Sequence, residues 1–134
     1  MTAKRVVLDS TPIIVGSVSG GTGLALYAPP GVVSEVLNTT SELQRSRVEA
    51  LLGSGAITVR APKTSSLERV RAVMNRDERE KASEADVEVL ALALELKEEG
   101  NDVLLLSDDS LVQRVAEKLG IACRGVKYPQ RPGA

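Results

Sequence analysis

Short aliphatic runs alternate along the chain with segments whose apolar residues recur every three or four positions. The runs are rich in β-branched or large aliphatic side chains and end in polar or breaker residues, which predicts short, largely buried strands. The predicted strands cover residues 5–9, 24–28, 56–61, 103–107 and 121–126. The segments between them have the apolar spacing of helices that bury one face. Helices are predicted to begin at Pro12 and at Pro29 and Pro30, and to cover residues 41–52, 66–74, 83–99 and 111–119.

Two segments interrupt this alternation. Residues 16–23 hold four glycines and three Ser or Thr residues, which predicts a flexible loop. The lysine of a GxxxxGK[ST] phosphate-binding loop is missing there. Residues 75–81 are almost all polar and predict a second mobile loop.

Strands that alternate with helices predict an α/β domain. The expected architecture is a three-layer α/β/α sandwich around a central, mostly parallel sheet of roughly five strands. A chain of 134 residues, 43% of them hydrophobic, has room for one such domain. Residues 1–126 are assigned to it, and residues 127–134 are assigned to a C-terminal tail.

Charge and aromatic content narrow the classes of function. The net charge of -1 denies the chain the overall positive field that carries many proteins onto nucleic acids. Only Tyr27 and Tyr128 are aromatic, so the base-stacking platforms of RNA-recognition folds cannot be built. Contact with nucleic acid must therefore be local or assisted by a cation.

The absence of histidine and the single cysteine exclude further chemistry. Ser/His/Asp catalysis, an internal disulfide and a cysteine-based zinc site are all ruled out within this chain. A bound metal would have to be a hard, oxygen-liganded ion such as Mg²⁺ or Mn²⁺. Cys123, in a predicted strand, is interpreted as a small buried hydrophobe. A reducing, cytoplasmic setting is expected, because the first apolar run, residues 6–8, is too short for a signal peptide or membrane span.

Five acidic residues are expected at one edge of the sheet. Asp9 and Asp108 each end a predicted strand, and Asp109 follows directly. Glu35 and Asp86 lie in the first turns of helices that should start from the same edge. Ligands bind beyond the carboxyl ends of parallel strands, and clustered carboxylates need protons or a cation. The sequence therefore predicts a divalent-metal site at this edge.

Most of these acids also have a local explanation. Asp86 lies three residues after Ser83, which is the spacing of a capping box. One member of the acidic pair after the fourth strand is expected to cap the next helix, and Glu35 alone would be read as a solvated helix acid. Asp9 has no such local explanation, because an ionised carboxylate at the end of an apolar strand is costly to bury without a partner.

Hydroxyl and basic residues are secondary candidates. Ser10, Thr11 and Ser107 flank the acids and could hydrogen-bond a ligand carboxylate or a metal-bound water, although ordinary turn chemistry also explains them. Several basic residues could border an RNA path, although helix surfaces carry such charges in any case. They are Arg45, Arg47, Arg69, Arg71, Arg76, Arg79 and Lys81.

Four sequence segments together resemble a PIN (PilT N-terminal) domain from end to end: VVLDSTPII, PPGVVSEV, ASEADVEVLALALEL and LLLSDDSLVQRVAEKLGI. The resemblance implies a metal-dependent ribonuclease with three or four acids at one edge of the sheet. By position it makes Asp9, Glu35, Asp86 and Asp108 the catalytic and metal-binding acids. It gives supporting roles to Asp109, as an additional acid, and to Ser10 and Ser107.

Within the family, the third and fourth segments look closest to the archaeal and eukaryotic Nob group, which processes the 3′ end of small-subunit ribosomal RNA. The sequence departs from that group in having no zinc ribbon after the PIN domain. A VapC-type toxin, although its usual TxDxxF-like ending is absent, and a catalytically silent binding module are the alternatives. The resemblance implies single-stranded or ribosomal RNA as substrate, and it leaves open a homodimer, an antitoxin or a ribosome-assembly partner.

Overall fold

The computed structural model describes residues 4–14, 25–39 and 41–126. The predicted glycine-rich loop at residues 16–23 and the tail at residues 127–134 lie outside the described residues. Among the described helices, none combines the length and the apolar character needed to span a membrane.

Five parallel strands form one sheet, as the sequence predicts. They are β1 (Lys4–Leu8), β2 (Ala25–Ala28), β3 (Ile57–Val59), β4 (Asp102–Leu106) and β5 (Ala122–Arg124). Their order across the sheet is β3-β2-β1-β4-β5, so β1 lies at the centre between β2 and β4. In the register of the central pair, Leu8 lies opposite Leu106, and the amide of Asp9 donates to the Leu106 carbonyl over 3.0 Å. The carboxyl ends of β1 and β4 therefore finish side by side.

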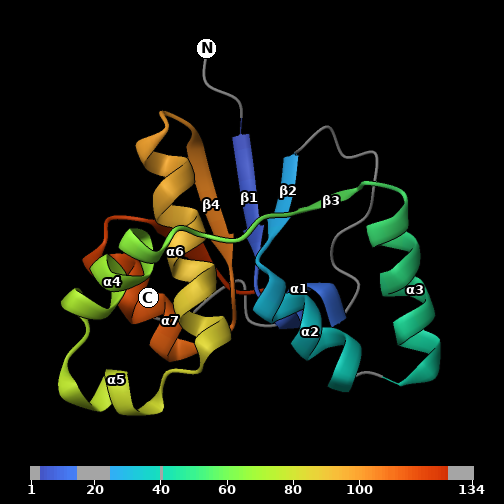
Figure 1. Cartoon of the computed structure of the whole chain (residues 1–134), viewed down its shortest axis with the longest axis horizontal. Helices are drawn as coiled ribbons and strands as arrows, with labels where there is room; N and C mark the ends of the chain where they lie inside the picture. Colours follow the sequence, from blue (N-terminus) through green and yellow to red (C-terminus); the bar gives the residue numbers. More distant parts are fainter. Residues whose placement is uncertain (1–3, 15–24, 40, 127–134) are drawn as a thin grey trace.

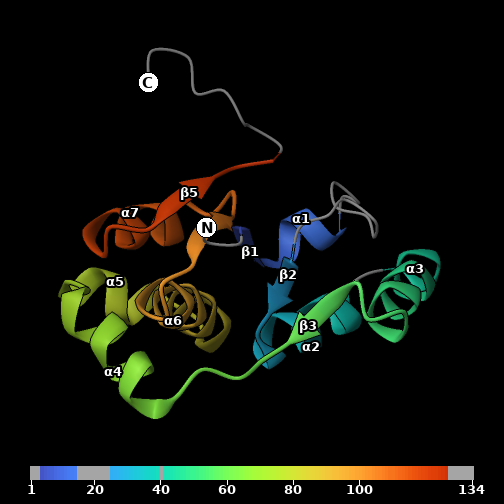
Figure 2. The same ribbon diagram turned by 90° about the horizontal axis from the view of Figure 1, so that it is seen from above.

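Seven helices are described around the sheet. They are α1 (Ser10–Ile14), α2 (Pro30–Thr39), α3 (Glu42–Gly53), α4 (Thr64–Val73), α5 (Arg76–Lys81), α6 (Glu84–Glu98) and α7 (Ser110–Lys118). Figure 2 shows α4, α6 and α7 on one side of the sheet and α1 and α3 on the other. The predicted α/β class and the parallel, five-stranded sheet flanked by helices are confirmed.

Helix α6 is the centre of the helical layer. It packs against α2, α4, α7 and the two central strands, and its residues from Val89 to Leu96 are all buried. Such burial around the whole circumference is typical of a helix inside a core rather than at a surface. Its first turn lies at the edge where β1 and β4 end (Figure 1), so the helix also brings Asp86 to that edge.

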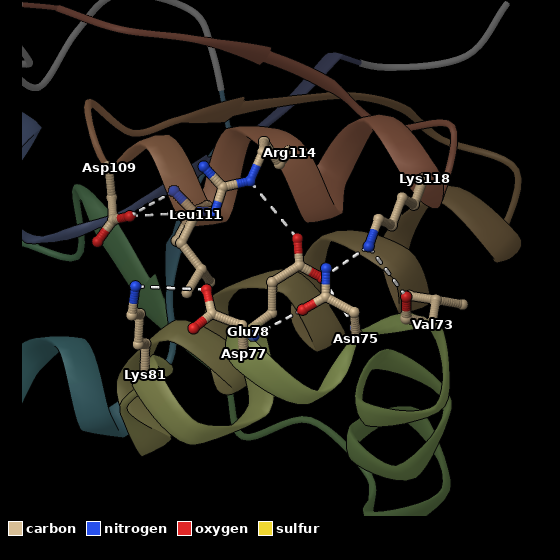
Figure 3. Close-up of polar contacts among 10 residues, drawn as sticks. Val73, Asn75, Asp77, Glu78, Lys81, Asp109, Leu111, Arg114 and Lys118 are labelled. Atoms are coloured by element: carbon tan, nitrogen blue, oxygen red, sulfur yellow. Dashed lines mark hydrogen bonds and ion pairs between the residues drawn. The ribbon is translucent and has the colours of Figure 1, made fainter.

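The prediction of a mobile loop at residues 75–81 is wrong. Asn75 begins helix α5 with a capping box, in which its side chain accepts from the Glu78 amide and the Glu78 carboxylate accepts from the Asn75 amide. Glu78 is only 2% exposed, and it accepts from Lys118 of α7 over 2.6 Å and lies 3.5 Å from Nε of Arg114 (Figure 3). The prediction relied on apolar spacing, which this polar segment lacks. The segment is ordered instead by buried Glu78, which pairs with basic residues of α7.

The apolar spacing of the helices predicted at residues 41–52 and 66–74 puts Leu43 and Val73 on their buried faces, and the structure differs at both positions. Leu43, placed on the inner face of the helix at residues 41–52, is 82% exposed. Helix α3 lies at the margin of the molecule (Figure 1), and Val48 is its one buried residue. In α4, Val73 is 37% exposed while the following Met74 is buried, since the helix ends at Val73 and the chain turns there.

Candidate active site

Asp9 is a buried acid, 8% exposed, at the junction of β1 and α1. Its Oδ1 accepts from the Ser10 amide over 2.9 Å, and its Oδ2 accepts from the Ser107 hydroxyl over 2.7 Å. Burial raises the pKa of Asp9 from 3.8 to about 6, the two hydrogen bonds oppose the rise, and the charges of Asp86 and Asp109 add to it. A buried carboxylate held among like charges favours either a proton or a cation.

Ser107 connects Asp9 to Asp109. Ser107 is fully buried, and its hydroxyl oxygen accepts from the Asp109 amide over 3.1 Å while it donates to Asp9. The Asp109 carboxylate caps α7, because its Oδ1 accepts from the Leu111 amide over 2.8 Å. One acid of the pair after the fourth strand therefore does cap the next helix, as expected. The same carboxylate adds to the effect of burial in raising the pKa of both Asp9 and Asp86, so it lies near both acids.

Asp86 combines a capping role with a place among the other acids. The Ser83 amide donates to its Oδ2 over 3.0 Å, and its own amide donates to the Ser83 hydroxyl over 3.1 Å, which confirms the capping box. Its pKa is raised, mainly by burial and further by the charges of Asp109 and Glu35. Asp86 therefore caps its helix, as its spacing from Ser83 predicts, and it also lies near the other acids.

Glu35 is joined to Asp9 through Ser10. The Ser10 hydroxyl donates to Oε1 of Glu35, and the Ser10 amide donates to Asp9. Glu35 is exposed on α2, whereas Asp9 is buried beneath it. Ser10 therefore links Asp9 to Glu35, and Ser107 links Asp9 to Asp109.

Asp108 makes a contact that the other acids do not share. Its Oδ1 accepts from the Val126 amide over 3.0 Å, and its charge raises the pKa of Cys123 in β5. The role of fourth metal ligand, predicted for Asp108, stays a prediction; the structure brings Asp109 to Asp9 and Asp86. The Ser107 hydroxyl contacts both the Asp9 carboxylate and the backbone amide of Asp109, and so links the ends of β1 and β4.

The acids surround the site without converging on a single point. Among the residues that the structure describes, no three acidic or cysteine side chains lie close enough to hold an ion as they stand. Their oxygen donors nevertheless suit Mg²⁺ or Mn²⁺. The capping bonds use one oxygen each of Asp86 and Asp109. Because mutual repulsion separates unneutralised carboxylates, a cation would draw these side chains together.

The remaining candidates lie outside this cluster. Cys123 is half-buried against the core, and burial raises the pKa of its thiol to about 11, consistent with its interpretation as a small hydrophobe. The guanidinium of Arg47 donates to the Ile13 carbonyl. Several of the basic residues proposed to border an RNA path form ion pairs with nearby acids. These pairs are Arg69–Glu98, Arg71–Glu84, Arg76–Glu80 and Lys81–Asp77.

The fold and the site together define an α/β protein with an acidic site at the carboxyl ends of its central parallel strands. The sequence model for the PIN domain of ribonuclease matches residues 6–96. The chain therefore belongs to the PIN-domain family of ribonucleases, as the four sequence segments predicted.

Named relatives agree with this assignment. Ribonuclease VapC3 of Aeropyrum pernix is 39% identical over 126 residues, which cover 93% of this chain and 88% of the relative. Endoribonuclease Nob1 of Pyrococcus abyssi is 41% identical over 124 residues, which cover 92% of this chain and 69% of the relative. The PIN domain of T. brucei RRP44 has the same fold, with a TM-score of 0.59 at 17% identity, over 94% of this chain and 76% of that one.

Proposed function

We propose that this chain is a divalent-metal-dependent endoribonuclease that hydrolyses RNA phosphodiester bonds at the acidic site. Its relatives are named ribonuclease and endoribonuclease. The observation that carries the proposal is the Asp9 carboxylate, which two serines hold by hydrogen bonds. Its burial, with a smaller effect of the neighbouring like charges, raises its pKa. Ionising a buried carboxylate costs free energy, and a bound cation would offset that cost.

Asp9, Asp86 and Asp109 would hold the ion, with Glu35 acting directly or through water. We propose Asp109 in preference to Asp108 as the ligand that follows β4, because the Asp109 charge acts on both Asp9 and Asp86. When bound, Mg²⁺ or Mn²⁺ would lower the pKa of a water molecule and neutralise charge on the phosphodiester during its hydrolysis. Ser10 and Ser107 keep the Asp9 carboxylate oriented and favour its ionised form. Exposed Glu35 would orient or deprotonate the attacking water.

A bound cation also accounts for an acidic protein acting on an anionic substrate. The net charge is -1, and at least four basic side chains on α4 and α5 are already paired with acids. The metal would supply positive charge at the site itself. Single-stranded RNA is the proposed substrate. Because the chain has only two tyrosines for base stacking, its contacts with RNA would be mainly to the phosphates.

The test compares single-stranded RNA cleavage in Mn²⁺ by the wild type, Asp9→Asn and Asp102→Asn. Asp102 is the matched control, because it is an exposed acid at the opposite end of β4 and pairs with Lys4. Asp9→Asn should lower the rate by more than about 100-fold, since even groups that only orient metal ligands account for about 10- to 100-fold. Asp102→Asn should cleave like the wild type. Equal rates in all three proteins would contradict the proposal, and a failure to take up Mn²⁺ in calorimetry would favour a silent binding module.

Processing of ribosomal RNA and a toxin role are two versions of this activity. The Nob1 relative supports the first, and ribosomal RNA would then be the substrate and assembly factors the partners. The VapC3 relative supports the second. Expression of the chain alone in bacteria separates them: growth arrest rescued by the product of a neighbouring gene indicates a toxin with an antitoxin, and harmless expression favours processing in the cytoplasm. Gel filtration tests the predicted homodimer.

A further inference from the structure

Glu88 joins the two helices that carry Glu35 and Asp86. Glu88 lies on α6, two residues after Asp86, and its Oε1 accepts from the Gly31 amide of α2 over 2.9 Å. Gly31 lies in the first turn of α2, four residues before Glu35. The contact spans 57 positions of sequence, so no local pattern would reveal it.

The amide that Glu88 binds belongs to the end of a helix. The first amides of a helix have no intrahelical acceptor and need another partner. Here the partner comes from α6, and beneath it Val32 and Val36 of α2 are fully buried. The hydrogen bond therefore fixes the first turn of α2 against α6 at a place where the helices already pack.

Gly31 permits this approach. A Cβ atom added at Gly31 would lie 2.8 Å from Oε2, 3.0 Å from Cδ and 3.1 Å from Oε1 of Glu88. The three nearest atoms all belong to the same carboxylate. An alanine at this position would therefore have to displace the Glu88 carboxylate or push α2 away from α6.

We propose that Glu88 is a positioning residue, which holds α2 against α6 and thereby sets the separation of Glu35 and Asp86 for cation binding. The inference rests on the proposed function, since it concerns the same acidic site. The charges of Glu35 and Asp86 already act on each other, so a small shift of α2 changes their contribution to a shared ion. Glu88 acts through its hydrogen bond to Gly31 and is not itself a ligand.

The test measures Mn²⁺ affinity by calorimetry and thermal stability for a set of matched variants. Glu88→Ala removes both the acceptor and the charge, whereas Glu88→Gln removes the charge and keeps an acceptor oxygen for the Gly31 amide. Gly31→Ala displaces the carboxylate sterically. Glu84→Gln is the control for charge alone, because Glu84 is also two residues from Asp86 on α6 but is exposed and pairs with Arg71.

Glu88→Ala and Gly31→Ala should each raise the Mn²⁺ dissociation constant about tenfold, at the lower end of the range for groups that orient metal ligands. Glu88→Gln and Glu84→Gln should bind Mn²⁺ like the wild type. The double variant Gly31→Ala with Glu88→Ala should be no weaker than Glu88→Ala alone, since both changes remove the same contact.

Three results would overturn this inference while leaving the proposed function intact. They are wild-type affinity in Glu88→Ala, equal loss in Glu88→Gln and Glu88→Ala, and losses that multiply in the double variant. The second result would assign the effect to charge rather than to the hydrogen bond. A wild-type protein that binds no Mn²⁺ would instead overturn the proposed function. Glu88→Gln keeps the test valid if Glu88→Ala fails to fold.

Discussion

The hydroxyl of Ser107 donates to the carboxylate of Asp9 over 2.7 Å, across two neighbouring strands and 98 positions of sequence. The bond exists because β1 and β4 pair in a register that ends both strands at the same level. Ser107 in turn accepts from the Asp109 amide. One buried hydroxyl thus fixes the relative positions of two acids that are far apart in the chain.

Removing this hydroxyl should shift the pH dependence of the protein. The Ser107 hydrogen bond lowers the pKa of Asp9, so Ser107→Ala should raise that pKa and move Mn²⁺ binding and RNA cleavage to higher pH. Ser107→Thr keeps a hydroxyl and should retain the wild-type profile. Calorimetric Mn²⁺ titrations over a range of pH measure the shift. Superimposable profiles for Ser107→Ala and the wild type would show that the bond does not control Asp9.

Asp108 and Asp109 should respond differently to the same substitution. Asp109→Asn should lose RNA cleavage by more than about 100-fold while keeping its stability, because asparagine caps a helix about as well as aspartate. Asp108→Asn should retain activity, since its amide oxygen can still accept from the Val126 amide. Cleavage rates and melting temperatures of the two variants provide the comparison. Loss of activity in Asp108→Asn alone would restore Asp108 as the fourth ligand.

Asp9 should make the metal-free protein less stable as pH rises. Its pKa is raised from 3.8 to about 6 in the folded state, so the folded protein holds a proton that the unfolded chain has released. The contribution of Asp9 to the free energy of unfolding should therefore fall between pH 3.8 and about 6 and change little above. A shift of about two pKa units corresponds to at most about 3 kcal/mol.

Urea denaturation of metal-free wild type and Asp9→Asn at several pH values measures this effect. Asp9→Asn lacks the titrating group, so the difference in stability between the two proteins should grow from pH 3.8 to about 6 in favour of the variant. The same variant should fail to bind Mn²⁺. A difference that stays constant with pH would mean that Asp9 titrates normally.

Glu78 should contribute to stability with the opposite dependence on pH. Hydrogen bonds from Lys118 and the Asn75 amide lower the pKa of Glu78 below 4.5. Its stabilising effect is therefore present above pH 4.5 and is lost as pH falls through the folded-state pKa. Glu78→Ala should cost about 2 kcal/mol at neutral pH, because it leaves the Asn75 amide and the Lys118 ammonium without their partner (Figure 3).

Glu78→Gln is the matched variant, because it keeps an acceptor for the Asn75 amide and removes the ion pair. Its loss of stability should be smaller than that of Glu78→Ala at neutral pH, and the gap to the wild type should close at pH below 4.5. Urea denaturation measures both. An unchanged stability of Glu78→Ala would mean that α5 does not depend on this buried acid.

The sequence by itself determined the α/β class, the parallel sheet and the approximate position of most elements. These follow from the spacing of aliphatic residues, which depends only on the periods of helix and strand. It also placed Asp9 at the end of a strand and Asp86 in a capping box, because both features are local.

Only the tertiary structure decided which partner each acid contacts and which polar contacts cross the fold. Asp108 and Asp109 are adjacent in sequence, yet one binds the Val126 amide beyond β5 and the other caps α7 beside Asp9. The burial of Glu78 depends on α7, and the contact of Glu88 with Gly31 depends on α2. Such contacts join residues dozens of positions apart, and strand register and helix packing bring them together without leaving a mark in any local pattern.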